Sequence, residues 1–133
     1  MTAESIVIDT DVASRLMRRT VPASVAARLT GATLVVTFVT VGELHRGAVH
    51  AGWGARRLAA LDRWLTRVVI LPADAGVARH WGEITGTALR TGRPLPANDA
   101  WVAACCLAYD AALATLNKRY FAGIDGLRLV STT

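Results

Sequence analysis

Short runs of valine, isoleucine, leucine and alanine alternate along the chain with longer segments of helical spacing. The runs cover residues 6–8, 34–36, 68–71, 112–116 and 127–130. Runs this short and this apolar are typical of strands that are buried on both faces of a parallel sheet. The pattern therefore predicts five strands.

The remaining segments have the spacing of helices. They cover residues 12–19, 22–29, 41–51, 55–67, 75–91 and 99–109. In the fifth segment, Val77, Trp81, Ile84 and Ala88 recur at steps of four, three and four, which places them in one apolar stripe. The last segment is apolar on nearly all sides, so we expect it to pack centrally. Helices alternating with buried strands predict a parallel α/β sheet with right-handed crossovers.

Four polar residues fall at the ends of these predicted elements. Asp9 follows the first strand, and Glu43 lies in the first turn of the helix after the second strand. Asp99 opens the central helix, and Asn117 ends the fourth strand. In an open parallel sheet, ligands bind outside the carboxyl ends of the strands. Because all four residues occupy that edge, we expect them to converge on one crevice.

Each of these positions also has a structural interpretation. Residues 9–11 fit the N-cap of the next helix, and residues 40–43 (T-V-G-E) fit a capping box. Residues 98–99 resemble a helix start, and Asn117 fits a turn. At any single position, the structural interpretation explains the residue at least as well as a functional role does. The coincidence of all four positions at strand ends favours a site.

Three clustered carboxylates predict a bound cation. A crevice that holds Asp9, Glu43 and Asp99 requires protons or a cation, because like charges repel. Oxygen ligands without thiolates or paired imidazoles select Mg²⁺ or Mn²⁺ rather than zinc. Such an ion neutralises phosphate charge and lowers the pKa of a bound water, which then attacks phosphorus in line. The expected reaction is metal-assisted hydrolysis of a phosphodiester bond.

The charge balance suits a polyanionic substrate. Fifteen Lys and Arg residues against ten Asp and Glu residues give a net charge of +5. If Asp9, Asp11, Glu43 and Asp99 share one site, six acidic residues remain to offset the basic residues elsewhere. A basic exterior around an acidic crevice suits RNA or DNA, although a protein that is simply basic fits the charge equally well.

The composition is that of a folded protein in a reducing compartment. Hydrophobic residues make up 53% and charged residues 19% of 133 residues, so we expect one domain over residues 1–133. The adjacent Cys105 and Cys106 are expected to be reduced core residues, because disulfide geometry disfavours joining neighbours on a helix. No stretch reaches the ~20 apolar residues of a membrane helix. No charged-then-apolar leader is found, so a cytoplasmic location is expected.

The ordered motifs resemble those of the PIN domain. They are Asp9 after the first strand, "TVGELHRG" with Glu43, "LPANDAWVAAC" with Asp99, and "LATLNKRYF" with Thr115, Asn117 and Phe121. No single motif is specific, but their order and spacing cover essentially the whole chain. More narrowly, the chain is similar to the VapC-type ribonuclease toxins of bacterial toxin–antitoxin pairs.

The resemblance implies a single PIN-like domain with a five-stranded, mostly parallel sheet flanked by helices. It also implies Mg²⁺- or Mn²⁺-dependent endoribonuclease activity, a homodimer, and inhibition by a small VapB-like antitoxin. Asp9, Glu43 and Asp99 match the three acidic positions of the family, and Asn117 matches the fourth, which is Asp in many members. We expect Asp9 and Asp99 to be the main metal ligands, and Glu43 to complete the water shell of the metal or to orient the attacking water. Attack by water would leave a 5′-phosphate and a 3′-hydroxyl.

Two residues depart from the family pattern, and a third supports it. Asn117 is a weaker cation ligand than a carboxylate. Asp11 stands where the family more often has a neutral polar residue, and its charge either compensates for Asn117 or points into solvent. Thr115 has the same strand parity as Asn117. The resemblance suggests that its hydroxyl helps to organise the site, and the alternative is an ordinary β-branched strand residue.

Basic and aromatic residues supply candidate contacts. RNA contacts are expected from Lys118, Arg119, Arg90 and Arg93 around the crevice, although charge runs are usually solvated faces. Trp53 lies between two glycines in "AGWGA" and is the best candidate for an exposed aromatic that contacts an antitoxin.

Two other functions remain open at this stage. Asp9 and Asp11 after a strand also resemble the nucleophile motif of haloacid-dehalogenase-type phosphatases, and Thr115 and Lys118 would fit that scheme. The phosphatase interpretation gives no role to the carboxylates of Glu43 and Asp99. The second alternative is a degenerate PIN-like module that binds RNA or a partner without cutting.

Overall fold

A parallel sheet in the order β3-β2-β1-β4 organises the fold. In this computed structural model, which describes residues 3–131, the strands are β1 (Ser5–Ile8), β2 (Thr33–Thr37), β3 (Val69–Leu71) and β4 (Ala112–Ala114). Val7 of the central strand pairs with Val35 on one side and with Leu113 on the other. All the pairings are parallel, which confirms the predicted sheet type and its first four strands.

The six predicted helices are present, with boundaries that differ by a few residues. The helices are α1 (Thr10–Arg18), α2 (Ala23–Leu29), α3 (Phe38–His50), α4 (Ala55–Leu65), α5 (Ala75–Arg90), α6 (Ala97–Ala108) and the short α7 (Lys118–Phe121), which the sequence pattern did not predict. Gly92 follows α5 with φ of 73°, a left-handed conformation that glycine adopts without steric cost.

The predicted fifth strand is reduced to a single bridge. Leu129 bridges Leu113 in parallel, and around it Leu113 N donates to Arg128 O (2.9 Å) and Val130 N donates to Leu113 O (2.8 Å). The segment 127–130 is interrupted by the exposed Arg128, and of its residues only Val130 is fully buried. A run with one buried side chain lacks the apolar faces that a longer internal strand requires, so the five-stranded prediction is wrong by one strand.

The core lies on both faces of the sheet, because successive side chains of β1 point in opposite directions. Val7 packs in one cluster with α5 and α6, whereas Ile6 and Ile8 pack in a second cluster with α1 and α2. Six residues of α6 are buried, which confirms its central position. Cys105 and Cys106 are buried free thiols, and burial raises the pKa of Cys105 to about 12.

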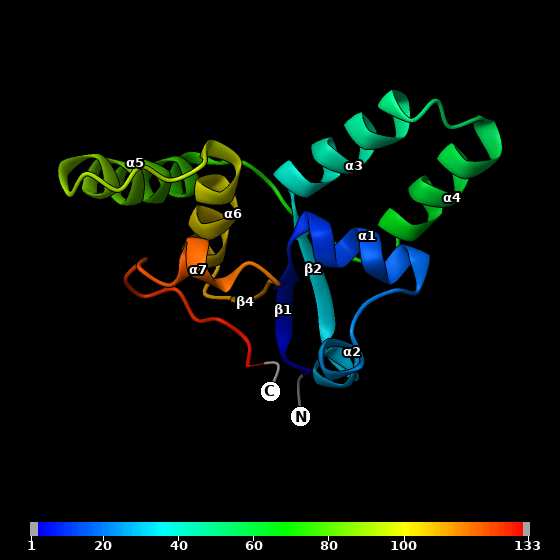
Figure 1. Cartoon of the computed structure of the whole chain (residues 1–133), viewed down its shortest axis with the longest axis horizontal. Coiled ribbons are helices and arrows are strands. Elements are labelled where there is room, and N and C mark those ends of the chain that lie inside the picture. The colour runs from blue at the N-terminus through cyan, green and yellow to red at the C-terminus, as the bar shows by residue number, and fades with distance from the viewer. Residues whose placement is uncertain (1–2, 132–133) are drawn as a thin grey trace.

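The helices divide into two groups around the sheet. Figure 1 shows α5, α6 and α7 on one side of β1, and α1, α3 and α4 on the other. Both α1 and α3 begin at the carboxyl ends of their strands, so this edge of the sheet is where the predicted site residues are carried. None of the helices in residues 3–131 combines the length and the apolar character needed to cross a membrane.

The buried strand β4 gives a stability prediction. Leu113→Ala is expected to lower the free energy of unfolding by about 2–5 kcal/mol, because its side chain is fully buried and leaves a cavity. The matched control is Leu89→Ala on α5, whose side chain is 71% exposed, and it should cost less than about 0.5 kcal/mol. Urea denaturation of the two variants checks this. Similar losses in both would contradict the assignment of β4 to the core.

Candidate active site

Asp9 lies at the centre of the site and uses both carboxylate oxygens. It is the N-cap of α1, where Oδ1 accepts a hydrogen bond from Val12 N (2.9 Å). Its Oδ2 accepts a hydrogen bond from Thr115 Oγ1 (2.5 Å), which comes from just beyond β4. The carboxylate is therefore fixed between the carboxyl ends of two adjacent strands.

Thr115 and Asn117 follow β4 and are connected to each other. The Thr115 hydroxyl is buried, and besides donating to Asp9 it accepts a hydrogen bond from Asn117 N (3.0 Å). Asn117 does not end the fourth strand as predicted, because β4 stops at Ala114; it is the exposed N-cap residue of α7, and its backbone is not in the left-handed region (φ −109°). The backbone of Asn117 is thus held close to Asp9 through one side chain.

Glu43 lies in the second turn of α3, not in the first turn as its sequence suggested. The helix begins at Phe38, because the Thr37 hydroxyl accepts from Thr40 N (3.4 Å) and caps it. The capping-box interpretation of residues 40–43 is therefore wrong. Glu43 Oε1 accepts from Thr10 Oγ1 (2.6 Å), which ties α3 to the first residue of α1.

Asp99 and its neighbour reach the same place from α6. Asp99 lies in the first turn of that helix, and Asn98 Nδ2 donates to Glu43 Oε2 (3.3 Å). The structure therefore brings together segments around residues 9, 43, 98 and 115, which are distant in the sequence.

The acidic side chains repel one another. Burial raises the pKa of Asp9, the charges of Asp11 and Asp99 raise it further, and the hydrogen bonds from Thr115 and Val12 oppose the rise. Burial also raises the pKa of Asp99, and the charge of Glu43 adds to that effect. A cation beside Asp9 and Asp99 would relieve both penalties.

Asp11 pairs with a basic residue. Arg15 Nε lies 3.1 Å from Asp11 Oδ1, one turn along α1, and the Asp11 side chain is 41% exposed. Its charge is offset locally by a guanidinium, although it still acts on the pKa of Asp9.

The donor set fits a magnesium-type ion that keeps most of its water. In residues 3–131, no three Asp, Glu, His or Cys side chains lie close enough to ligate one ion together. Mg²⁺ is commonly bound through one or two carboxylates, with waters in its other positions. Asp9 and Asp99 have hard oxygen donors and raised pKa values, so they suit direct ligation. Glu43 is already hydrogen-bonded by Thr10 and Asn98, which suits an indirect role.

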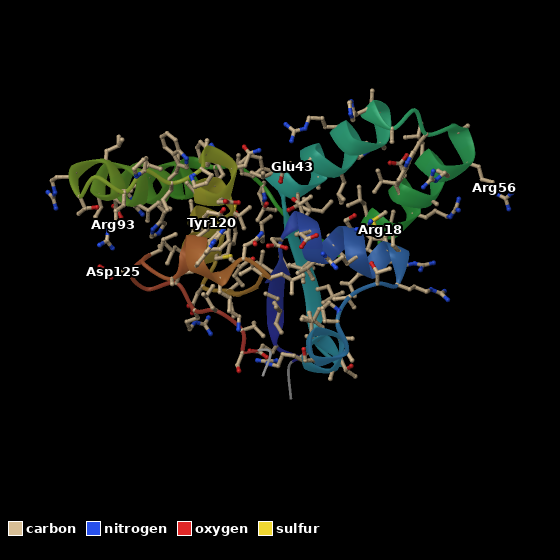
Figure 2. The ribbon with its side chains drawn as sticks, in the orientation of Figure 1. Arg18, Glu43, Arg56, Arg93, Tyr120 and Asp125 are labelled. Atoms are coloured by element: carbon tan, nitrogen blue, oxygen red, sulfur yellow. The ribbon has the colours of Figure 1, made fainter. Side chains whose placement is uncertain are left out.

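The candidate RNA-binding residues occupy different places. Lys118 and Arg119 begin α7 directly after Asn117, and the Arg119 guanidinium lies over the Tyr120 ring, 5.1 Å from its centroid. Arg90 is in the last turn of α5, and Figure 2 shows Arg93 far from Glu43, at the outer end of that helix. The structure therefore brings only the first pair close to the site.

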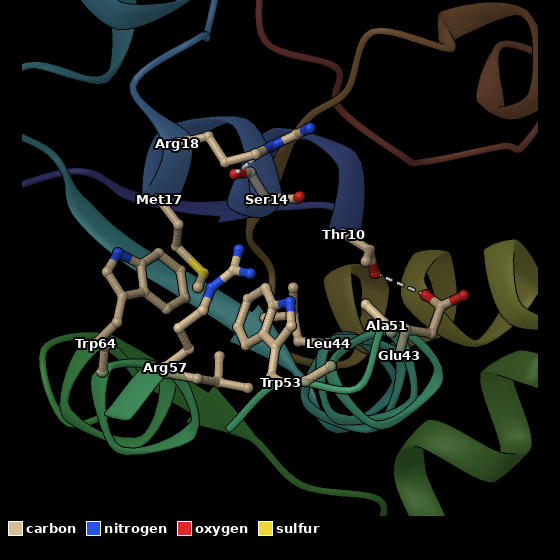
Figure 3. Close-up of a pocket in the computed structure, with 14 residues that line it drawn as sticks. Thr10, Ser14, Met17, Arg18, Glu43, Leu44, Ala51, Trp53, Arg57 and Trp64 are labelled. Carbon is tan, nitrogen blue, oxygen red and sulfur yellow. Dashed lines mark hydrogen bonds between the residues drawn. The ribbon is translucent and has the colours of Figure 1, made fainter. Parts of the chain in front are cut away.

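A groove opens directly from the site. Its volume is about 660 Å³, and Thr10 and Glu43 line one end of it. Figure 3 shows Trp53 and Trp64 along the groove, with the Arg57 guanidinium beside Trp53 (4.3 Å to the ring centroid). The groove runs between α1, α3 and α4 and combines an apolar floor with basic side chains.

Sequence reasoning missed the polar residues that support the site. Thr10 Oγ1 lies 3.0 Å from Thr40 Oγ1 in addition to its bond to Glu43, and Asn98 holds the other oxygen of that carboxylate. In the sequence, only the closeness of Thr10, Thr40 and Asn98 to the three acidic residues could have indicated this supporting role. The groove itself had no signal, because three separate helices form it.

Comparison with known proteins agrees with the fold. The PIN domain family matches residues 6–127. Ribonuclease VapC1 of Haemophilus influenzae (strain R2866) is 29% identical over 124 residues, which cover 91% of this chain and 92% of that protein. The tRNA(fMet)-specific endonuclease VapC of Shigella flexneri is 33% identical over 109 residues, which cover 80% of this chain and 83% of that protein.

Solved structures lead to the same group. The structure of VapBC-1 from nontypeable Haemophilus influenzae matches with a TM-score of 0.85 at 28% identity, covering 96% of this chain and 98% of that chain. DNA-bound VapBC from Salmonella typhimurium shares the fold, with a TM-score of 0.86 at 24% identity and coverage of 98% and 99%. Family match, relatives and fold agree, so the chain belongs to the PIN domain family, as a member of the VapC type.

Proposed function

We propose that this protein is a Mg²⁺- or Mn²⁺-dependent endoribonuclease, and that it acts in the cytoplasm as the toxin of a type II toxin–antitoxin pair. The observation that carries the proposal is the convergence of Asp9, Glu43 and Asp99 at the carboxyl edge of the sheet, where their charges act on one another. The relatives that are named ribonuclease or endonuclease support the reaction class.

Asp9 and Asp99 would hold the metal ion. When bound, the ion supplies charge neutralisation at the phosphate and lowers the pKa of a water. Thr115 and Val12 N orient the two oxygens of Asp9, so its direction does not depend on the ion. The backbone of Asn117 is bonded to Thr115, and its side chain would offer only a neutral amide, whose weaker ligation favours one tightly held ion.

Glu43 would orient the attacking water. Thr10 and Asn98 donate to its two oxygens, and these bonds hold the carboxylate as an acceptor. An acceptor fixed beside a metal-binding pair is suited to take a proton or a hydrogen bond from water.

The partner would be a VapB-like antitoxin that lies in the groove. Solved relatives are VapBC assemblies, and the groove shares Thr10 and Glu43 with the site. A segment with apolar side chains would bury Trp53, Trp64 and Met17, and it would cover the entrance to the carboxylates. Inhibition then follows from occupying the groove.

A homodimer has one supporting feature. Val69 and Ile70 on the edge strand β3 are both roughly half-exposed, at 48% and 44%. An exposed apolar edge is a surface that a second copy would bury.

The alternatives differ in their support. The family match gives no support to the phosphatase interpretation. A non-catalytic PIN-like module would bind RNA equally well in EDTA and would not cleave it with Mg²⁺ or Mn²⁺.

The first prediction concerns Asp9. Asp9→Asn should keep the fold, because Val12 N retains an acceptor, and it should lower Mg²⁺-dependent RNA cleavage by about 10³-fold or more through the loss of metal ligation. Mg²⁺ should raise the Tm of the native protein and not that of the variant. Asp125→Asn, a change at an exposed position, is the matched control. Cleavage by Asp9→Asn at the native rate would refute the assignment.

The second prediction concerns pH in EDTA. The folded-state pKa values of Asp9 and Asp99 are raised, so their protonated forms stabilise the fold below the unfolded pKa of about 3.9. This contribution is lost as the pH rises through the folded pKa. Asp9→Asn should therefore gain stability relative to the native protein as the pH increases from about 4 to neutrality. Denaturation across this range measures the difference, and a constant difference would contradict the prediction.

The third prediction concerns the groove. Gly47 lines it, and a Cβ at this position meets nothing within 4 Å. Gly47→Leu should fold normally and should escape inhibition when the protein is co-expressed with its VapB-like antitoxin. Gly82→Leu on α5 also meets open space and is the control. Equal inhibition of both variants would exclude the groove as the docking site.

A further inference from the structure

The positive charge of the protein is concentrated on one side. We define the cationic flank as residues 9–19 and 38–67, which comprise Asp9, α1, Arg19, α3, α4 and the connections between α3 and β3 up to Arg67. It contains eight Arg residues and four acidic residues, whereas the rest of the chain contains seven basic and six acidic residues. Four of the five net positive charges therefore belong to this flank.

Within the flank, Arg56 and Arg63 on α4 and Arg67 in the turn beyond its last residue form a stripe. Arg56 and Arg63 are seven residues apart, and Arg67 follows four residues later, so they recur on one face of the helical path. The rise along a helix places Arg56 and Arg63 about 10 Å apart along the axis of α4. All three are exposed, and the ion pairs found in residues 3–131 involve none of them. Figure 2 shows Arg56 extending away from the ribbon.

No acidic side chain of α4 neutralises the stripe. Asp62 is the only acidic residue of that helix, and its Oδ1 lies 3.4 Å from His45 Nε2 on α3. The stripe borders the groove but does not line it, since the lining residues of α4 are Arg57, Ala60, Leu61 and Trp64. A peptide in the groove would contact Arg57, whereas Arg56 and Arg63 face the solvent beside it.

We propose that Arg56, Arg63 and Arg67 bind the phosphate backbone of an extended or structured RNA, at a distance from the cleaved bond. The groove connects the catalytic end at Thr10 and Glu43 with α4, so an RNA that enters the crevice and continues across the groove reaches the stripe. Solvent-exposed guanidiniums on one side of α4, which form no ion pair within residues 3–131, suit phosphates, which they bind with release of counterions. An RNA too short to reach α4 does not use these contacts.

This inference rests on the proposed ribonuclease function, and a binding measurement in EDTA separates the two. The probes are an in vitro transcribed tRNA and a short single-stranded oligonucleotide, each titrated by fluorescence anisotropy over a range of KCl concentrations. The variant is Arg56→Gln/Arg63→Gln. The control, Arg79→Gln/Arg128→Gln, removes the same charge from α5 and from the C-terminal segment.

The expected result is a change that is specific to long RNA. For the tRNA, the slope of log affinity against log salt should decrease by about two in Arg56→Gln/Arg63→Gln, one for each lost phosphate contact. The preference for tRNA over the oligonucleotide should fall by at least about tenfold. The control should keep both the slope and the preference.

Three outcomes would overturn the inference. They are an unchanged salt slope in Arg56→Gln/Arg63→Gln, an equal loss in the control, and a loss of antitoxin inhibition in this variant while tRNA binding stays native. The last would assign the stripe to a protein partner. Stripe-dependent tRNA binding by a protein that cleaves no RNA with Mg²⁺ or Mn²⁺ would support the inference and refute the proposed function.

Discussion

The site depends on the hydrogen bonds of the partly buried Asp9 carboxylate, at the carboxyl end of the central strand. One oxygen begins α1 by accepting from Val12 N, and the other accepts from Thr115, just beyond β4. A single side chain therefore connects two neighbouring strands and a helix. Burial and the nearby charge of Asp99 raise the pKa of Asp9 and disfavour its ionised form. Hydrogen bonds nevertheless fix the carboxylate in this position, where a bound cation would stabilise its negative charge.

Asp9 can cap a helix and still be available as a metal ligand, although these two roles were treated as alternatives in the sequence analysis. The carboxylate caps α1 with Oδ1 and turns Oδ2 toward Thr115. In a parallel α/β fold, the carboxyl ends of strands and the N-termini of the following helices meet at one edge of the sheet. Acidic residues are favourable at helix N-termini, which also explains Asp99 in the first turn of α6. The hydrogen bond that caps α1 fixes the position of the Asp9 carboxylate, and a metal site would need its ligand fixed in the same way.

Local patterns predicted most of the fold, and packing decided the rest. Short apolar runs and helical periodicity are local properties, so four strands, six helices and the burial of α6 could be predicted. Glu43 was placed one turn too early because the predicted helix began at residue 41, whereas Thr37, the last residue of β2, caps α3 and starts it at Phe38. The bonds from Thr10 and Asn98 to Glu43 join residues 33 and 55 positions apart, and no local pattern reports such contacts. The fifth strand failed because Arg128 interrupts its apolar run.

The two faces of the sheet differ in their packing and in their charge. The side formed by α5 and α6 is largely a core, with Trp81 stacked on Trp101 at 4.7 Å between ring centroids. The side formed by α1, α3 and α4 holds the groove and most of the net charge. An acidic crevice repels a polyanion, so the proposed RNA substrate would need basic residues beside the crevice to approach it. Because the groove leads from Glu43 toward those residues, the proposed RNA and the proposed antitoxin would follow overlapping paths, and an antitoxin in the groove would block access to Asp9 and Asp99 without contacting them.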